Sequence, residues 1–287
     1  MWPPWSEDSP ANLNAAACRR LGDPTRHWLG STGVSGNVLS LGWPLAVLLS
    51  VFTIAAAAVV RSAGLGDWRA PITAAARCVV QLAAVSLVIG YVLRSMWWTV
   101  AFVGFMVLVA AGTSGRRITG SLGWRSTWMV LPILLAVSPP IALALIAGVV
   151  PVEPIAVLPT SGILVGGAMT AATLAGRRVI DELEAHRGSY DAALALGFTR
   201  RQSVGIVARG PAALALVPGQ DQTRTVGLVT LPGAFVGVLL AGASPVEAGA
   251  AQAFILIALL MVQAVAAAVT IELIAAAQVR GKSALPA

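Results

Sequence analysis

Residues 250–277 read AAQAFILIALLMVQAVAAAVTIELIAAA, a run whose single charged side chain is Glu272. A helix needs about 20 consecutive apolar residues to cross the hydrocarbon core of a bilayer, so this run is long enough to span a membrane. Further apolar segments precede it, and the sixth of the resulting set is interrupted by Pro232 and Gly233. We place about seven spans, at residues 39–60, 71–93, 96–114, 127–149, 155–175, 223–243 and 250–277. The sequence therefore predicts an all-α fold, a polytopic transmembrane helical bundle.

The composition of the 287-residue chain supports this prediction, because 57% of its residues are hydrophobic and only 11% are charged. A soluble domain carries about 25% charged residues, so the composition argues against a water-soluble enzyme of this size. The net charge of +7 comes from cationic residues spread between the apolar segments, which is unlike a nucleic-acid-binding surface. The two cysteines, Cys18 and Cys78, form neither a disulfide framework nor a metal motif.

The distribution of arginine and lysine predicts the orientation of the bundle. With the N-terminus outside, the inner loops and the C-terminus carry fourteen of these residues, whereas the short outer loops carry only Arg94. Short cytoplasmic loops are enriched in Arg and Lys. An odd number of spans, with the N-terminus outside and the C-terminus inside, is therefore predicted for a multi-pass protein of the cell (plasma or inner) membrane.

Three parts follow from this organisation. Residues 1–37 show no hydrophobic periodicity, which predicts a disordered tail or a start codon assigned too early. Residues 38–280 form the transmembrane domain, and residues 281–287 form a cytoplasmic tail. Residues 203–218 are apolar but too short to span, so they are expected to lie at the membrane surface or to re-enter it.

The polar segment 176–210 falls on the inner side and contains two predicted short helices. The first covers residues 176–187, and Gly188 is expected to break the chain after it. Ser189 then occupies a position typical of an N-cap, and Gly197 offers the C-terminal stop of the second helix. A solvated helical loop is one interpretation of this segment, and a docking element for a cytoplasmic partner is the one that we favour.

The second of these helices presents distinct faces. Asp191 in its first turn interacts favourably with the helix dipole, and Tyr190, Ala193 and Leu194 share an apolar face. An apolar face on a cytoplasmic helix predicts contact with another surface.

Sequence motifs for catalysis are absent. Gly281-Lys282-Ser283 resembles the end of a phosphate-binding loop, but Ala276 stands where that loop requires its first Gly. His27 and His186 are too isolated to form a catalytic pair or a ligand cluster. We therefore expect that the chain is not an enzyme, hydrolyses no nucleotide and binds no cofactor of its own.

The order Asp191-Ala192-Ala193, followed four residues later by Gly197, resembles the Glu-Ala-Ala loop of ABC transporter permeases, with Asp191 in place of Glu. In those proteins a short helix and a Gly turn fit a groove on a separate ATPase subunit. The resemblance implies a set of ATPase-coupling residues. These are Ser189, Tyr190, Asp191, Ala192, Ala193, Leu194 and Gly197.

A second resemblance lies in residues 218–252, which contain TVGLVTLPG at 225–233. This block is similar to the most distinctive block of the iron-export ABC permease family of the FetB/YbbM type, which has plant relatives linked to aluminium tolerance. The resemblance covers about residues 40–277. It implies a homodimeric permease subunit that exports iron or another metal ion, driven by a cytoplasmic ABC ATPase that binds the ATP. Another substrate, such as a nucleotide sugar, is the alternative.

Residues with a possible role in the pathway or as hinges come from motif matches and from intramembrane polarity. They are Gln81, Gly162, Gly166, Asp221, Thr225, Gly227, Pro232, Gly233 and Gln252. Non-helical backbone at membrane depth is tolerated only where protein buries it or where it lines a cavity. A packing kink and a carbonyl site for a cation are both compatible with Pro232 and Gly233. The metal ligands cannot be identified from the sequence.

Several of these positions also have simpler structural interpretations. Gly162 and Gly166 suit close helix packing, Asp221 and Arg224 suit an ion pair, and Glu272 is expected to reach the inner interface. Gln81, Gln252 and Gln263 are expected to face the interior of the bundle.

Two functions from other classes compete with an ABC permease. An ion-gradient-driven secondary carrier would require an intramembrane acidic or basic relay, for which only Glu272 and Asp221 are candidates. A structural membrane protein would use segment 176–210 to recruit a partner without transport.

Overall fold

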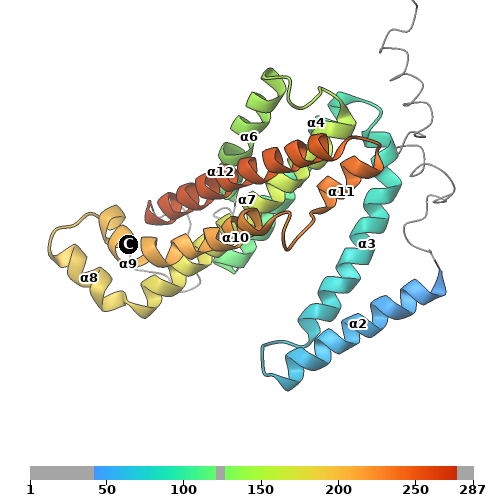
Figure 1. Cartoon of the computed structure of the whole chain (residues 1–287). Helices are drawn as coiled ribbons and strands as arrows, with labels where there is room; N and C mark the ends of the chain where they lie inside the picture. The colour runs from blue at the N-terminus through green and yellow to red at the C-terminus, as the bar shows by residue number, and fades with distance from the viewer. Residues whose placement is uncertain (1–41, 121–126, 277–287) are drawn as a thin grey trace, which may run out of the picture. The chain divides into compact units, whose positions relative to one another are not determined.

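Helices account for most of the described chain, which comprises residues 42–120 and 127–276 of a computed structural model (Figure 1). In chain order the elements are α2 (Trp43–Ser62), α3 (Arg69–Val92), α4 (Met96–Thr119), α6 (Val130–Ile146), α7 (Pro154–Ala185), α8 (Arg187–Ala195), α9 (Arg200–Ala212), the 3₁₀ helix η1 (Ala213–Leu216), α10 (Val217–Thr225), α11 (Gly233–Leu240) and α12 (Pro245–Ala275). Within the described ranges there is no β-strand. The predicted all-α architecture is confirmed, and the predicted tails 1–37 and 281–287 lie outside the described residues.

Among the described helices, α2, α3, α4, α7 and α12 are long and apolar enough to cross a membrane. Helix α6 is also apolar but has only 17 residues. The predicted span 223–243 is not one helix, because α10 ends at Thr225 and α11 begins at Gly233. The protein is thus a multi-pass helical membrane protein, while the count of seven spans and the N-out orientation stay predictions.

The described residues divide into two compact units, with the boundary between Ala83 and Ala84. In the first unit, α2 and the N-terminal part of α3 expose most of their described side chains. Trp68 lies between the two helices, and the guanidinium carbons of Arg61 and Arg69 are 6.0 and 5.4 Å from the centroid of its ring. Trp is enriched at membrane–water interfaces, so this cluster is typical of a connection at the membrane surface.

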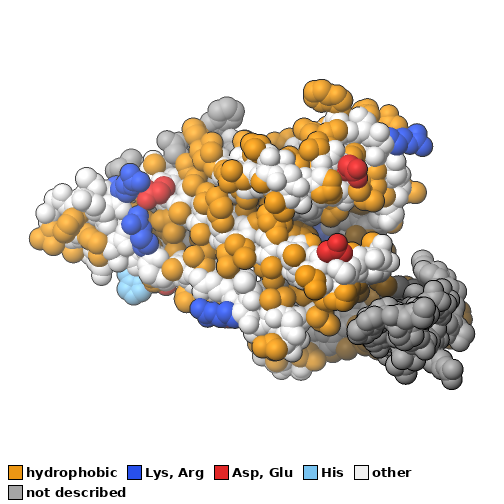
Figure 2. Space-filling model, turned by 45° about the horizontal axis from the view of Figure 1, so that its top comes forward, with side chains coloured by type: hydrophobic (Ala, Val, Ile, Leu, Met, Phe, Trp, Pro, Cys, Tyr) orange, Lys and Arg blue, Asp and Glu red, His pale blue; other side chains and the backbone are white. Residues whose placement is uncertain are grey.

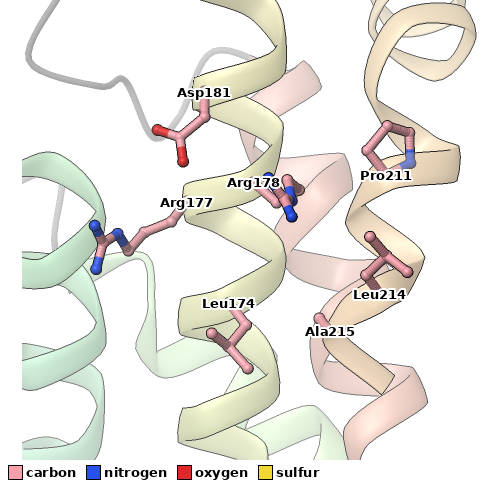
Figure 3. A pocket seen from close by; sticks show the side chains of 7 residues that line it. All are labelled: Leu174, Arg177, Arg178, Asp181, Pro211, Leu214 and Ala215. Carbon is pink, nitrogen blue, oxygen red and sulfur yellow. The ribbon is translucent and has the colours of Figure 1, made fainter. Parts of the chain in front are cut away.

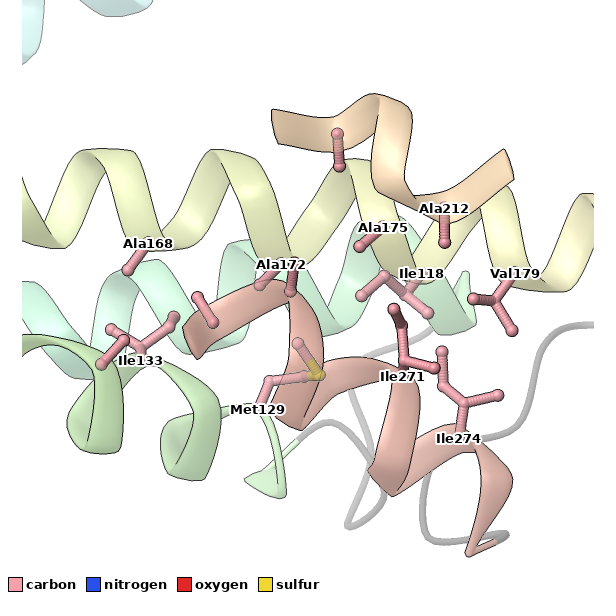
Figure 4. Close-up of a cluster of buried hydrophobic side chains, with 14 of the residues drawn as sticks. Ile118, Met129, Ile133, Ala168, Ala172, Ala175, Val179, Ala212, Ile271 and Ile274 are labelled. Atoms are coloured by element: carbon pink, nitrogen blue, oxygen red, sulfur yellow. The ribbon is translucent and has the colours of Figure 1, made fainter. Parts of the chain in front are cut away.

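Helix α7 lies at the centre of the second unit and contacts α4, α6, α9 and α12. Small side chains, including those of Ala168, Ala172 and Ala175, are buried on it (Figure 4). Without a hydrophobic driving force between helices in lipid, small residues permit the close approach on which van der Waals packing depends. The face shown in Figure 2 carries many hydrophobic and few charged side chains, and many large hydrophobic side chains of the described residues are exposed. Such a surface is expected of a unit that is surrounded by lipid.

The start of the polar segment 176–210 differs from its prediction. Helix α7 continues without interruption to Ala185, and the break falls at His186, with φ −115° and ψ 37°. Gly188 and Ser189 lie in the first turn of α8, so the predicted break at Gly188 and the predicted N-cap at Ser189 are wrong. Helix α7 continues because no proline follows Gly176 within it. Gly188 is tolerated because it lies in the first turn of α8, where the backbone N–H groups have no partner within the helix in any case.

Residues 203–218 belong to a longer helical stretch that runs through α9, η1 and α10. Arg209 and Pro211 lie inside α9, and the change to 3₁₀ geometry follows directly after them at Ala213. The stretch packs on α7 and α12, with Val204, Ala208 and other small or branched side chains buried. The expectation that it lies at the membrane surface or re-enters the membrane stays a prediction.

Candidate functional site

The end of α8 is fixed by Gly197, whose φ of +89° lies in the left-handed region. The N–H of Gly197 donates to the carbonyl of Leu194 at 3.0 Å, and the N–H of Phe198 donates to that of Ala193 at 3.1 Å. This pair of bonds is the Schellman motif, which favours glycine at the left-handed position. The predicted stop at Gly197 is confirmed.

The predicted apolar face of α8 consists of two buried side chains, Tyr190 and Ala193, and one exposed side chain, Leu194. Tyr190 and Ala193 are only 5% and 6% exposed, and α8 contacts α9 and α7. Asp191 and Ala192 are exposed, and Leu194 keeps 39% of its surface. The buried pair therefore holds the loop together, and the outer residues are the ones that a partner can reach.

Two further apolar side chains lie at the end of α8 and just beyond it. Leu196 is 79% exposed and Phe198 is 43% exposed. Together with Leu194 they form an exposed group, which we call the α8 tip. Analysis of the sequence missed Leu196 and Phe198, although both stand beside the Gly197 turn and lack a helical face to bury them.

Helix α9 begins at a capping box. The hydroxyl of Thr199 accepts from the N–H of Gln202 at 3.4 Å, and the Gln202 side chain accepts from the N–H of Thr199 at 2.9 Å. A capping box satisfies two backbone donors that a helix start leaves free. The T-x-x-Q pattern was a readable signal for this start.

Glu272, in the last turns of α12, joins that helix to α9 through two arginines. Its Oε1 accepts a hydrogen bond from Nη2 of Arg209 at 2.9 Å, and its Oε2 pairs with Nε of Arg201. Sequence analysis expected Glu272 only to reach the interface. We call this group of three residues the Glu272 clasp, and it ties the segment next to the α8 tip to the longest apolar run of the chain.

Within the block 225–233, residues 226–232 form a compact non-helical turn between α10 and α11. Gly227 has φ +82° and donates to the carbonyl of Thr230 at 2.9 Å, and Leu228 and Val229 both donate to the carbonyl of Thr225. Pro232 is the N-cap of α11 and Gly233 is its first residue. The helix break expected at Pro232 and Gly233 is thus present, and local bonds satisfy part of its backbone.

Gln252 supports this break from α12. It is 5% exposed, and its Oε1 accepts a hydrogen bond from the N–H of Phe235 in the first turn of α11 at 3.2 Å. Since the first N–H groups of a helix have no partner within it, the amide acts as a cap. This contact gives Gln252 a structural role at the break between α10 and α11. Its predicted burial is confirmed.

Gln263 is the second buried amide of α12, with 9% of its surface exposed. A Cβ on Gly219 of α10 would overlap its side-chain oxygen and lie 2.7 Å from its Cδ, and a Cβ on Gly167 of α7 would lie 3.6 Å from its Nε2. The absence of side chains at these two glycines makes room for the amide. Its Oε1 has no hydrogen-bond partner among the described residues.

The remaining predicted positions differ in their surroundings. A Cβ on Gly162 would lie 3.3 Å from Met106 of α4, whereas Gly166 has nothing within 4 Å of that point, so the two do not form one contact. Asp221 and Arg224 form the expected ion pair at 3.6 Å. Gln81 is exposed within the first unit, so the expectation that it is buried in the interior of the bundle is not met there. No group of three His, Cys, Asp or Glu side chains suited to a metal occurs in the described part of the chain.

Comparison with known proteins assigns these features to a family. Residues 43–278 match the family described as Uncharacterised protein family (UPF0014). The chain is 35% identical over 177 residues to the "UPF0014 membrane protein STAR2" of rice, which covers 61% of this chain and 62% of that protein. It is 34% identical over 176 residues to the "Protein ALUMINUM SENSITIVE 3" of Arabidopsis thaliana, covering 60% of this chain and 63% of that protein.

A bacterial relative is also similar. Over 183 residues the chain is 30% identical to the "Probable iron export permease protein FetB" of Escherichia coli, which covers 60% of this chain and 67% of that protein. The chain thus spans a little under two thirds of the two plant relatives. No solved structure matches it. The family resemblance that was read from the sequence motifs is confirmed.

Proposed function

Because the chain belongs to the UPF0014 family of membrane proteins, we propose that it is the permease subunit of an ABC transporter that exports iron or another metal ion. Two copies of the chain pair with two copies of a cytoplasmic ATPase in the plasma or inner membrane. The ATPase binds and hydrolyses ATP, and the permease supplies the pathway and the coupling.

The strongest support for this proposal is the connection between the α8 tip and α12. The tip exposes Leu194, Leu196 and Phe198 on a rigid capped loop, as a docking surface requires. The Glu272 clasp joins the adjoining α9 to α12 through Arg201 and Arg209 of α9. A force applied to the tip by an ATPase is therefore transmitted to a membrane-spanning helix, because packed helices and ion pairs carry coupling between distant sites.

Helix α12 also carries the two buried amides. Gln252 caps α11 at the helix break, and Gln263 places an oxygen that has no hydrogen-bond partner among the described residues next to Gly219. Movement of α12 thus acts at the same time on the break at 226–232 and on Gln263. In this mechanism the Gln263 oxygen is a transient contact for the exported cation, since amide oxygens are among the ligands of hard cations.

The charges argue against a carrier that is driven by an ion gradient. Such a carrier relies on an acidic or basic relay within the membrane. The two acidic candidates already have cationic partners, Glu272 in the clasp and Asp221 with Arg224. Their pairing favours a coupling role and a structural role, respectively.

The test is co-purification of the tagged permease with a candidate cytoplasmic ABC ATPase from the same organism. Leu196→Asp and Phe198→Asp place a charge on the α8 tip and should abolish co-purification while leaving the permease folded, because both side chains are exposed. Val246→Asp is the matched control, since Val246 is 81% exposed at the far end of α12. Ala193→Trp is a poorer choice, because Ala193 is buried and its enlargement would disrupt the loop itself.

The substrate is tested with inside-out membrane vesicles that contain the purified complex. ATP-dependent accumulation of Fe²⁺ should be lost in Gln263→Leu, while ATPase co-purification stays normal. Unchanged recruitment in both tip variants would contradict the coupling assignment and favour a structural protein. Recruitment without transport of Fe²⁺ or of other divalent ions would contradict the metal substrate and point to a nucleotide sugar or another solute.

A further inference from the structure

A cavity of about 230 Å³ opens on the second unit, between α7 and the end of α9 with η1 (Figure 3). Its lining combines charged and apolar side chains, which are Leu174, Arg177, Arg178, Asp181, Pro211, Leu214 and Ala215. It is separate from the α8 tip, the Glu272 clasp and Gln263, and the proposed transport function makes no use of it.

The cavity lies where α7 leaves the apolar part of the membrane. Twenty residues separate Pro154, where α7 begins, from Leu174, and at 1.5 Å per residue they cover about 30 Å, the thickness of the hydrocarbon core. Arg177 and Arg178 are the first charged residues of the helix. The cavity therefore presents leucines at acyl-chain depth and arginines at headgroup depth.

The two arginines of the cavity are among those that have no acidic partner in the described part of the chain, whereas several other arginines of the same unit are paired. Arg187, Arg201, Arg209 and Arg224 each lie within 4.0 Å of a carboxylate. Arg177 and Arg178 form no such pair within the described residues, although Asp181 lies one turn away. In Figure 3, Arg178 extends from α7 on the side of Pro211 and Leu214, whereas Arg177 and Asp181 extend from the other side of the helix.

We propose that this cavity binds the phosphate of an anionic phospholipid, with Arg178, which extends toward Pro211 and Leu214, as the cation that contacts it. A guanidinium matches the oxygens of a phosphate with two parallel hydrogen bonds. Free phosphate offers the same chemistry. The lipid is favoured because Leu174 and Leu214, which are 42% and 55% exposed, provide an apolar wall for the start of the acyl chains. Basic pockets beside transmembrane helices bind anionic headgroups in this way.

Binding would bridge α7 and the segment formed by the end of α9 and η1, which already contact each other. Arg178 belongs to α7, while Pro211 and Leu214 belong to the segment that continues into α10. A lipid held between them fixes the position of η1 against α7. This inference depends on the placement of α7 in a membrane, and it is independent of the ATPase and of the metal substrate.

The test uses the purified full-length protein in detergent and measures binding of dioleoyl phosphatidylglycerol by native mass spectrometry. Phosphatidylcholine and inorganic phosphate are the comparison probes. Arg178→Gln should weaken binding of phosphatidylglycerol at least tenfold. Arg187→Gln removes the same charge from an exposed residue that pairs with Asp191, and it should leave binding within twofold.

A variant that is expected to bind the lipid more tightly distinguishes a change in lipid contact from a loss of folded protein. Asp181→Asn removes the negative charge of the cavity and should tighten binding by about threefold, as expected for one exposed charge interaction. Equal binding of the two lipids, or normal binding by Arg178→Gln, would overturn the proposal. Inorganic phosphate that displaces the lipid at equal concentration would show a free-phosphate site instead. Loss of ATPase co-purification in Arg178→Gln with lipid binding intact would assign the cavity to the partner protein.

Discussion

The contact of α7 with α4 and α12 at Gly176 makes a sharp test of the packing. A Cβ added at this position would lie 2.5 Å from Cδ1 of Ile118, 3.0 Å from its Cγ1 and 3.2 Å from Cγ2 of Thr270. Both neighbours are β-branched and at most 6% exposed, so neither side chain moves away easily. The substitution Gly176→Ala should therefore overpack the centre of the bundle.

Gly166→Ala is the matched control, because Gly166 lies in the same helix and has nothing within 4 Å of its added Cβ. Replacing Gly by Ala in a helix stabilises it by about 0.5–1 kcal/mol, and both variants gain this term. Overpacking costs about 1–3 kcal/mol, and Gly176→Ala alone bears it. The free energies of unfolding of the two variants should thus differ by about 1–3 kcal/mol.

Reversible unfolding in mixed micelles, followed by tryptophan fluorescence, measures these free energies. Ile118→Val removes the Cδ1 atom that lies nearest to the added methyl group. In that background the cost of Gly176→Ala should fall by about 1 kcal/mol, as a coupling between contacting residues. An equal effect of the two Gly substitutions, or a cost that Ile118→Val leaves unchanged, would refute the packing described for α4 and α7.

Three further substitutions test single contacts of the site. Glu272→Gln should destabilise the protein by about 1 kcal/mol, because it removes two partly exposed ion pairs at once, and the loss should shrink in high salt in urea titrations. Thr199→Ala should cost about 1 kcal/mol and speed hydrogen exchange in the first turn of α9, while Thr53→Ala, which removes no cap, leaves that exchange unchanged. Gln252→Leu should expose the N–H of Phe235 to faster exchange at a cost of about 1 kcal/mol, and unchanged exchange there would exclude the cap.

Features that depend on nearby residues could be predicted from the sequence. The apolar runs give the positions of α2, α3, α4, α7 and α12, because hydrophobic length alone sets a membrane span. The pair of Asp221 and Arg224 follows from its spacing of three residues, and the stop at Gly197 follows from the freedom of Gly to adopt positive φ.

Features that depend on tertiary contacts could not be predicted. Glu272 is 63 residues away from Arg209 in the sequence, and only the packing of α9 along α12 brings their side chains together. The burial of Ala193 and the fit of Gln263 against Gly219 likewise require a neighbouring helix. The continuation of α7 past Gly176 was missed because the change to polar residues was taken as the end of the helix, whereas only the backbone geometry at His186 ends it.

The continuity of α12 limits the kinds of mutation that this chain can accept. Gln252 and Gln263 are eleven residues apart, so they lie about 20° from each other around the helix, while Glu272 lies about 180° from Gln263. Insertion or deletion of one residue between them would rotate one set of partners by about 100° relative to the other. After such a change in length, the contact of Gln252 at the helix break and the contacts of Glu272 in the clasp could not form at the same time, even if every side chain were kept. Within this helix, substitutions can therefore accumulate during evolution while the number of residues stays constant.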